Sequence, residues 1–337
     1  MRTAVLLLLA AAAHAQFKST VPLVVAPTTV VNHKGHYVDG LTTDDLILYD
    51  NNVPQRLQMD WMLFPIDLAV VVETGANAGA VIDKLGGSGI LFSALVAADA
   101  GETAVLSFSN TVRVHQKFTP DPDPVTKALR NLHKEGGQAR ILDALQAAMR
   151  IFEERPAGRR RIILAIAEKR DRGSEATLSQ VMEEAQRRNV TIYWLTYSPF
   201  LEPFTARPKT GPDPNKPNTA DQVMPPCAWC AKEPDVALPP DLGPGGLIYG
   251  LGELFRLKQP DLADLFTRNT GGRTMGFLKK SGLEDTIRLI GEEVHRQYIL
   301  TFEPKGGLAG QYHSIRAVVK GRPELTVKTR EGYWVVQ

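Results

Sequence analysis

The chain has 337 residues, of which 43% are hydrophobic and 23% are charged, values typical of a globular protein with room for two domains. Its 39 lysines and arginines nearly balance 37 aspartates and glutamates, and no basic stripe stands out, which argues against a nucleic-acid partner. Beyond the N-terminus, no segment approaches the roughly 18 apolar residues of a membrane-spanning helix.

The first fifteen residues have the features of a secretory signal peptide. Met1-Arg2 supplies a short positive region, an apolar run covers residues 4–13, and Ala13-His14-Ala15 forms an A-x-A cleavage site. We therefore expect residues 1–15 to be removed. The mature protein is expected to be secreted or periplasmic, without a transmembrane segment.

Residues 16–64 are predicted to form a β-rich head. Strands are expected at Val21–Ala26, at Thr28–Asn32 and at Leu46–Tyr49. A turn then leads into a further extended segment, Val53–Met62. A segment of this length cannot bury a generous core by itself.

The most informative stretch is Ile66–Asn77, with the sequence IDLAVVVETGAN. A short apolar run that ends in turn residues predicts a strand buried on both faces, as at the centre of a parallel sheet. In open α/β sheets, ligands bind at the carboxyl ends of such strands. The turn that begins at Glu73 is therefore a candidate functional site, although a plain strand-to-helix turn would have the same pattern.

Helices and strands alternate from this stretch to residue 296. The expected helices are Val81–Ala98 (interrupted by glycines), Asp123–His133 (with Asp123 as its cap), Ile141–Phe152, Leu178–Gln186, Leu247–Leu257, Pro260–Thr267 and Leu283–Glu293. The expected strands are Ala104–Phe108, Val112–Phe118 (an edge partner), Ile162–Ala167 and Val190–Leu195. The alternation predicts a doubly wound, mostly parallel sheet flanked by helices over residues 65–296.

A proline-rich insertion at residues 199–243 interrupts this unit. Proline disfavours helices and sheet interiors, so the insertion is expected to be extended and on the surface. It contains both cysteines of the chain, Cys227 and Cys230. A local disulfide is the favoured interpretation for an exported protein, with a reactive or metal-binding pair as the alternative.

Residues 297–337 return to β character. Strands are expected at Gln297–Phe302, at Ser314–Lys320 and at Leu325–Thr329. Because the head and this tail are both β-rich and flank the α/β unit, we expect them to pair in one small β module.

Several motifs in this order resemble von Willebrand factor type A domains, most closely the exported bacterial subgroup. They are the strand that ends in an acid at Val70–Glu73, Gly136-Gly137 before the helix with Asp143-Ala144-Leu145, and Arg161–Glu168 followed by Asp171-Arg172-Gly173-Ser174. In the head and tail, Asp39–Leu46 and Val327–Tyr333 fit the same subgroup. The resemblance implies a doubly wound fold and, in many members, a metal-ion-dependent adhesion site.

That adhesion site is a turn with the pattern Asp-x-Ser-x-Ser, plus a threonine and a later aspartate, which together hold magnesium for a partner's carboxylate. The resemblance places Glu73-Thr74-Gly75-Ala76-Asn77 at the turn. It places the threonine at Ala139, or at Gln138 if the gap shifts by one. The late aspartate falls at Glu168, with Asp171 as a substitute.

These substitutions weaken the expected metal site. Magnesium requires near-octahedral oxygens at about 2.0–2.1 Å, and Gly75 and Ala139 have no side-chain oxygen. Glu73 and Glu168 are each one methylene longer than aspartate. Without a cation the two acids repel each other, which raises the pKa of at least one. We expect no cofactor here, with weak Mg²⁺ or Ca²⁺ binding through Glu73, Asn77 and Glu168 as the alternative.

Catalytic signatures are missing from the sequence. It contains no G-x-S-x-G, no H-E-x-x-H and no phosphate-binding G-x-x-x-x-G-K-[ST]. Glu73 and Glu168 as the acid and base of a hydrolase are the least favoured hypothesis. The sequence therefore predicts a non-catalytic, exported module that binds an unidentified protein partner, with metal-dependent adhesion as the second hypothesis.

Overall fold

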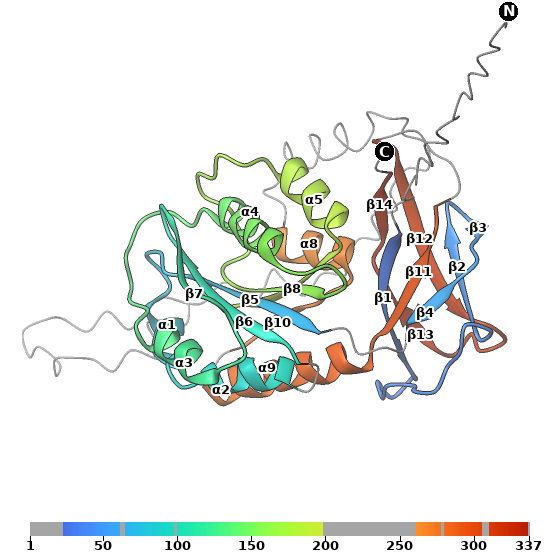
Figure 1. Cartoon of the computed structure of the whole chain (residues 1–337), viewed down its shortest axis with the longest axis horizontal. Coiled ribbons are helices and arrows are strands. Elements are labelled where there is room, and N and C mark those ends of the chain that lie inside the picture. Colours follow the sequence, from blue (N-terminus) through green and yellow to red (C-terminus); the bar gives the residue numbers. More distant parts are fainter. Residues whose placement is uncertain are drawn as a thin grey trace, which may run out of the picture.

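The computed structural model describes residues 23–60, 65–97, 100–197, 261–277, 280–304 and 310–335. The expected signal peptide, the proline-rich insertion, both cysteines and the expected helix at Leu247–Leu257 lie outside these ranges. Figure 1 shows an α/β unit beside a smaller β module. In the described ranges, no helix has both the length and the apolar character needed to cross a membrane.

A six-stranded sheet forms the centre of the α/β unit, in the order β10-β9-β8-β5-β6-β7. Its strands are β5 (Ile66–Glu73), β6 (Glu102–Phe108), β7 (Val112–Thr119), β8 (Arg160–Ile166), β9 (Val190–Thr196) and β10 (Thr274–Gly276). Every neighbouring pair is parallel except β6 and β7, which form the antiparallel edge. All eight residues of β5 are buried. The expected doubly wound, mostly parallel sheet is confirmed.

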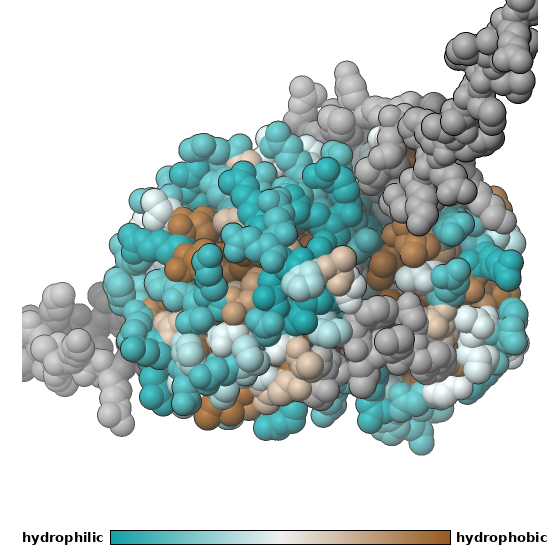
Figure 2. All heavy atoms as spheres, in the orientation of Figure 1, coloured by the Kyte–Doolittle hydropathy of each residue, from teal (hydrophilic) through white to brown (hydrophobic). Residues whose placement is uncertain are grey.

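Helices cover both faces of this sheet (Figure 1). One layer contains α1 (Gly79–Leu85), α2 (Gly89–Ala97), α3 (Pro122–Arg130) and α9 (Lys280–Arg296), and the other contains α4 (Ile141–Ile151), α5 (Leu178–Arg187) and α8 (Leu262–Thr270). Alternate residues of β5 pack into the two cores, Val70 and Val72 into the first and Ala69 and Val71 into the second, because successive strand residues point to opposite faces. Hydrophilic side chains cover the outer side of α4 and α5 (Figure 2).

Two helix predictions need correction. The expected helix at Val81–Ala98 is two helices, α1 and α2, which separate at the glycines that interrupt the pattern. The cap of α3 is Asp121, whose side chain accepts a hydrogen bond from the backbone N–H of Asp123. The prediction of Asp123 as the cap is therefore wrong. The sequence Asp121-Pro122-Asp123-Pro124 contains two Asp-Pro pairs, and each of them predicts a helix start.

The β module consists of two four-stranded sheets, in the orders β13-β1-β11-β4 and β14-β12-β2-β3. The head supplies β1 (Val24–Val31), β2 (Leu46–Asp50), β3 (Val53–Pro54) and β4 (Gln58–Asp60), and the tail supplies β11 (Tyr298–Phe302), β12 (Tyr312–Val319), β13 (Thr326–Lys328) and β14 (Gly332–Trp334). β1 pairs with β11 and β13, and β2 pairs with β12. Head and tail thus share one hydrophobic core.

The first two expected strands of the head are one strand, β1, that continues through Pro27. Pro27 lies opposite Ile299 of β11, whereas β13 pairs with β1 only from Thr29 onward. The missing N–H of Pro27 is therefore tolerated, because the sheet is incomplete on one side of this residue.

Candidate functional site

The carboxyl ends of β5 and β8 bring Glu73 and Glu168 together, as the sequence predicted. The two strands are in parallel register, with Val72 opposite Ile166. The backbone N–H of Glu168 donates to Oε2 of Glu73 at 2.8 Å. Both residues are buried, with exposed fractions of 2% for Glu73 and 5% for Glu168.

The carboxylate of Glu168 has a protein donor on each oxygen. Asn77 donates from Nδ2 to Oε1 at 2.7 Å, and Arg172 donates from Nη2 to Oε2 at 2.7 Å. We refer to Glu73, Asn77, Glu168 and Arg172 as the carboxylate cluster. No sequence pattern assigned a role to Arg172. Arg172 follows Glu168 by four positions, a spacing that predicts an ion pair on a helix. Here the two residues lie in a loop, where that spacing has no such meaning.

Burial is the main cause of the raised pKa of Glu73. Desolvation, which disfavours the ionised form, raises the pKa of Glu73 from near 4.5 to about 7. The hydrogen bond from the Glu168 N–H opposes this rise, and the neighbouring Glu168 carboxylate adds to it. The expected increase in one pKa is thus present, but burial contributes more to it than repulsion between the two acids.

Gly75 fits closely against the side chain of Glu73. A Cβ atom at position 75 would lie 3.3 Å from Oε1 of Glu73 and 3.5 Å from the carbonyl oxygen of Gly137. The longer acid therefore occupies space that a side chain at position 75 would need. Thr74 turns away, because its N–H and its hydroxyl both donate to the carbonyl of Phe108, at 2.8 and 3.0 Å.

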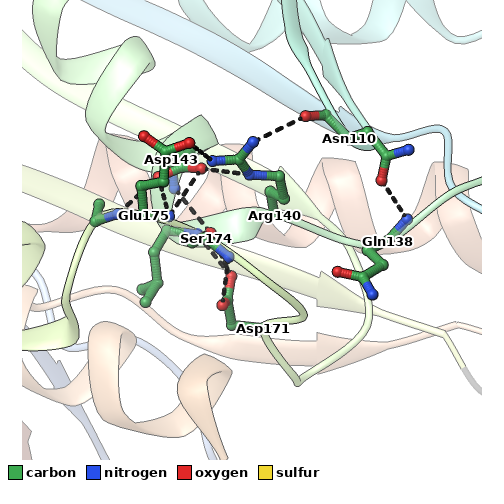
Figure 3. Close-up of polar contacts among 9 residues, drawn as sticks. Asn110, Gln138, Arg140, Asp143, Asp171, Ser174 and Glu175 are labelled. Carbon is green, nitrogen blue, oxygen red and sulfur yellow. Dashed lines mark hydrogen bonds and ion pairs between the residues drawn. The ribbon is translucent and has the colours of Figure 1, made fainter.

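Neither residue at the expected threonine position supplies an oxygen to the two glutamates. Ala139 is buried in the second core, and its carbonyl accepts from the N–H of Arg172 at 2.8 Å. The N–H of Gln138 donates to Oδ1 of Asn110 at 2.8 Å (Figure 3), and its side-chain carbonyl lies against Gly173.

Asp171 is engaged elsewhere, at the start of α4. Its carboxylate accepts from the hydroxyl and the N–H of Ser174 at 2.6 and 3.2 Å and from the N–H of Leu142 at 3.3 Å. Figure 3 shows Asp171 and Ser174 beside Asp143 and Arg140, whose side chains form an ion pair of 2.7 Å. The structure thus gives Asp171 a capping role and does not bring it to Glu73.

The strand-end face is the surface around this cluster, formed by the turn 74–77 and the loops 131–140 and 168–175. Hydrogen bonds tie loop 131–140 to the turn after β5 and to the other loop. The N–H of Glu135 donates to the carbonyl of Thr74 at 2.9 Å, and the N–H of Arg172 donates to the carbonyl of Ala139 as above. In the described ranges, no group of three His, Cys, Asp or Glu side chains is arranged to hold a metal ion.

Comparisons with known proteins give one family match and several similar structures. Residues 88–169 match the von Willebrand factor type A domain family. This segment runs from α2 to just beyond β8 and contains Glu168, but not Glu73, Asn77 or Arg172. No curated protein matches the sequence.

Three solved structures are similar. The SpRpn10 VWA domain shares 10% identity (TM-score 0.40, 66% of this chain and 94% of that one). An aerotolerance-related membrane protein from Bacteroides fragilis NCTC 9343 shares 13% identity (TM-score 0.41, 68% and 99%). BatB from Bacteroides thetaiotaomicron shares 14% identity (TM-score 0.43, 68% and 97%). At these scores they say nothing about ligands or partners. The family match, within a mostly parallel sheet of this order, identifies the α/β unit as a von Willebrand factor type A-related domain.

Proposed function

We propose that this chain is an exported, non-catalytic protein-interaction module whose strand-end face binds its partner without a resident metal ion. The family match supports an interaction role for the α/β unit. Export is supported by the sequence of residues 1–15 alone.

The carboxylate cluster is the observation that carries this proposal. A divalent ion needs several oxygens directed at it, but both oxygens of Glu168 and Oε2 of Glu73 already accept hydrogen bonds from nitrogen donors. The guanidinium of Arg172 supplies the positive charge that an ion would otherwise provide. An incoming cation would have to displace Arg172 and would meet a second acid whose pKa is about 7.

The same contacts argue against a hydrolase. A glycosidase-type pair must place both of its carboxyl groups against a substrate. Here three of the four carboxylate oxygens accept hydrogen bonds within the protein, and both residues are nearly inaccessible to solvent.

Metal independence can be tested by calorimetric titration of the EDTA-treated, full-length protein with Mg²⁺, Mn²⁺ and Ca²⁺. We expect no saturable binding below about 1 mM. Arg172→Ala frees Oε2 of Glu168 and should permit weak Ca²⁺ binding, whereas Arg170→Ala, in the same loop, should not. Saturable binding to the wild-type protein that Glu73→Ala abolishes would overturn the proposal.

Partner binding can be tested with the tagged protein as bait in the extracytoplasmic fraction of its own organism. Ala76 is exposed in the turn after β5, and Ala157 is exposed in the loop before β8, at the opposite end of the sheet. We expect the captured partner to be lost with Ala76→Glu and kept with Ala157→Glu, with or without EDTA. Capture that requires a divalent ion would contradict the proposed function.

A further inference from the structure

We propose that the strand-end face recognises an acidic segment of its protein partner directly, through the cationic side chains of Lys134, Arg170 and Arg172. This inference rests on the proposed function, because it names the chemistry of the partner that the face would bind.

On the strand-end face, most exposed charges are positive and the acids beneath them are largely buried. Among the exposed residues of loops 131–140 and 168–175, the charged ones at neutral pH are Lys134, Lys169, Arg170, Arg172 and Glu175, which gives 4 − 1 = +3. The acids Glu168 and Glu135 lie beneath them, with side chains only 6% and 13% exposed. A partner therefore meets cations first.

Three of these cations are available to a ligand. Lys169 is paired with Asp261 at 2.6 Å, but Lys134 and Arg170 form no ion pair with any described residue. Arg172 holds Glu168 on its inner side, yet 45% of its side chain is exposed. A guanidinium held on one side by a buried carboxylate loses little side-chain entropy when its outer side binds another.

The arrangement suits a chain of carboxylates better than a compact anion such as phosphate. Phosphate is bound by clustered backbone N–H groups at helix starts and tight turns. At the start of α4, the N–H groups of Leu142 and Asp143 are taken by Asp171 and Ser174, and that of Gln138 is taken by Asn110. The cationic donors are long side chains on two loops, which can reach several carboxylates along an extended segment.

The test uses the full-length protein and a fluorescein-labelled oligoglutamate peptide, with binding followed by fluorescence anisotropy at low ionic strength. The site variant is Lys134→Glu/Arg170→Glu, which leaves the carboxylate cluster intact. The matched control is Lys34→Glu/Lys127→Glu, which changes net charge equally at exposed lysines in the β module and on α3. We expect the site variant to bind about tenfold more weakly and the control within about twofold of wild type.

Each other outcome overturns the inference. Equally weaker peptide binding by both variants would show an effect of net charge alone and would contradict a specific site. Absence of peptide binding by the wild-type protein would also contradict the inference. Displacement of the peptide by inorganic phosphate at equal concentration would point to a phosphate site instead. Peptide binding only with added Ca²⁺ or Mg²⁺ would refute direct recognition and also the metal-free proposed function. EDTA-insensitive partner capture without peptide binding would refute this inference alone.

Discussion

At the scale of single residues, Glu73 shows what one methylene group changes at the end of a strand. The longer side chain reaches the backbone N–H of Glu168 and takes up the space beside Gly75. Its carboxyl group is also removed from water, so that it holds a proton up to about pH 7. The same residue thus fills the site sterically and lowers its negative charge.

Glu73 should make the protein less stable as the pH rises. Below pH 4.5 both the folded and the unfolded chain keep the Glu73 proton. Between pH 4.5 and about 7 only the unfolded chain releases it, so the free energy of unfolding falls. The wild-type protein should lose about 3 kcal/mol of its free energy of unfolding in this way by pH 8. We expect Glu73→Gln to abolish that loss at pH 8 and to change the free energy of unfolding little at pH 4.

Urea denaturation from pH 4 to pH 8 would measure this difference. Glu154→Gln is a suitable control, because it makes the same chemical change in a side chain that is 73% exposed. A constant offset between Glu73→Gln and wild type across the range would contradict the assigned pKa.

At the scale of elements, β5 has a buried acid at each end, and the two are held differently. At its amino end, Asp67 is fully buried and accepts from Arg155 at 3.0 Å on each oxygen and from Arg159 at 2.7 Å. The hydrogen bonds to Asp67 raise the pKa of Arg155. One end of the strand is therefore fixed by two arginines, and the other end carries the carboxylate cluster.

Asp67→Ala should destabilise the fold without affecting the strand-end face. The substitution leaves two largely buried guanidinium groups without their main carboxylate, which costs about 3 kcal/mol. Urea denaturation at pH 7 would measure the loss, and oligoglutamate binding below the unfolding transition should stay as in the wild type. A loss under about 1 kcal/mol would show that Glu102, the second acid near Arg155, compensates.

The sequence predicted those elements whose patterns are long. The apolar runs of β5 and β8 and the periodicity of α4 identified them. The three-residue strands β10 and β14 were missed, because so few residues show no alternation.

At the candidate site, the resemblance assigned Glu73 and Asn77 in one turn and Glu168, after another strand, to the same site. It could not show that Arg172 folds back on Glu168, because that contact depends on the path of a loop rather than on a sequence period.

At the scale of the whole molecule, Arg330 links the two units. It lies between β13 and β14 and is buried. Its guanidinium donates to the carbonyl of Val25 in β1 at 3.1 Å and to the side chain of Asn189, just before β9, at 3.4 Å. Burial lowers its pKa to about 10, so it is charged at neutral pH while it joins head, tail and α/β unit.

Deletion of residues 297–337 should abolish soluble expression, because both neighbours of β1 come from the tail. Without them, β1 would expose unpaired N–H and C=O groups along both sides, which favours aggregation. Deletion of the proline-rich insertion, residues 199–243, is the control and should leave the protein soluble. A monodisperse protein without the tail would contradict the shared β module.

The position of β1 also determines when the molecule can finish folding. During synthesis, β1 leaves the ribosome early but has no neighbouring strand until β11 and β13 have been made, more than 260 residues later (298 − 31 = 267). Contacts of such long sequence separation form slowly. The chain therefore passes through synthesis with its first strand unpaired, and the β module can close only after the last strands have been made.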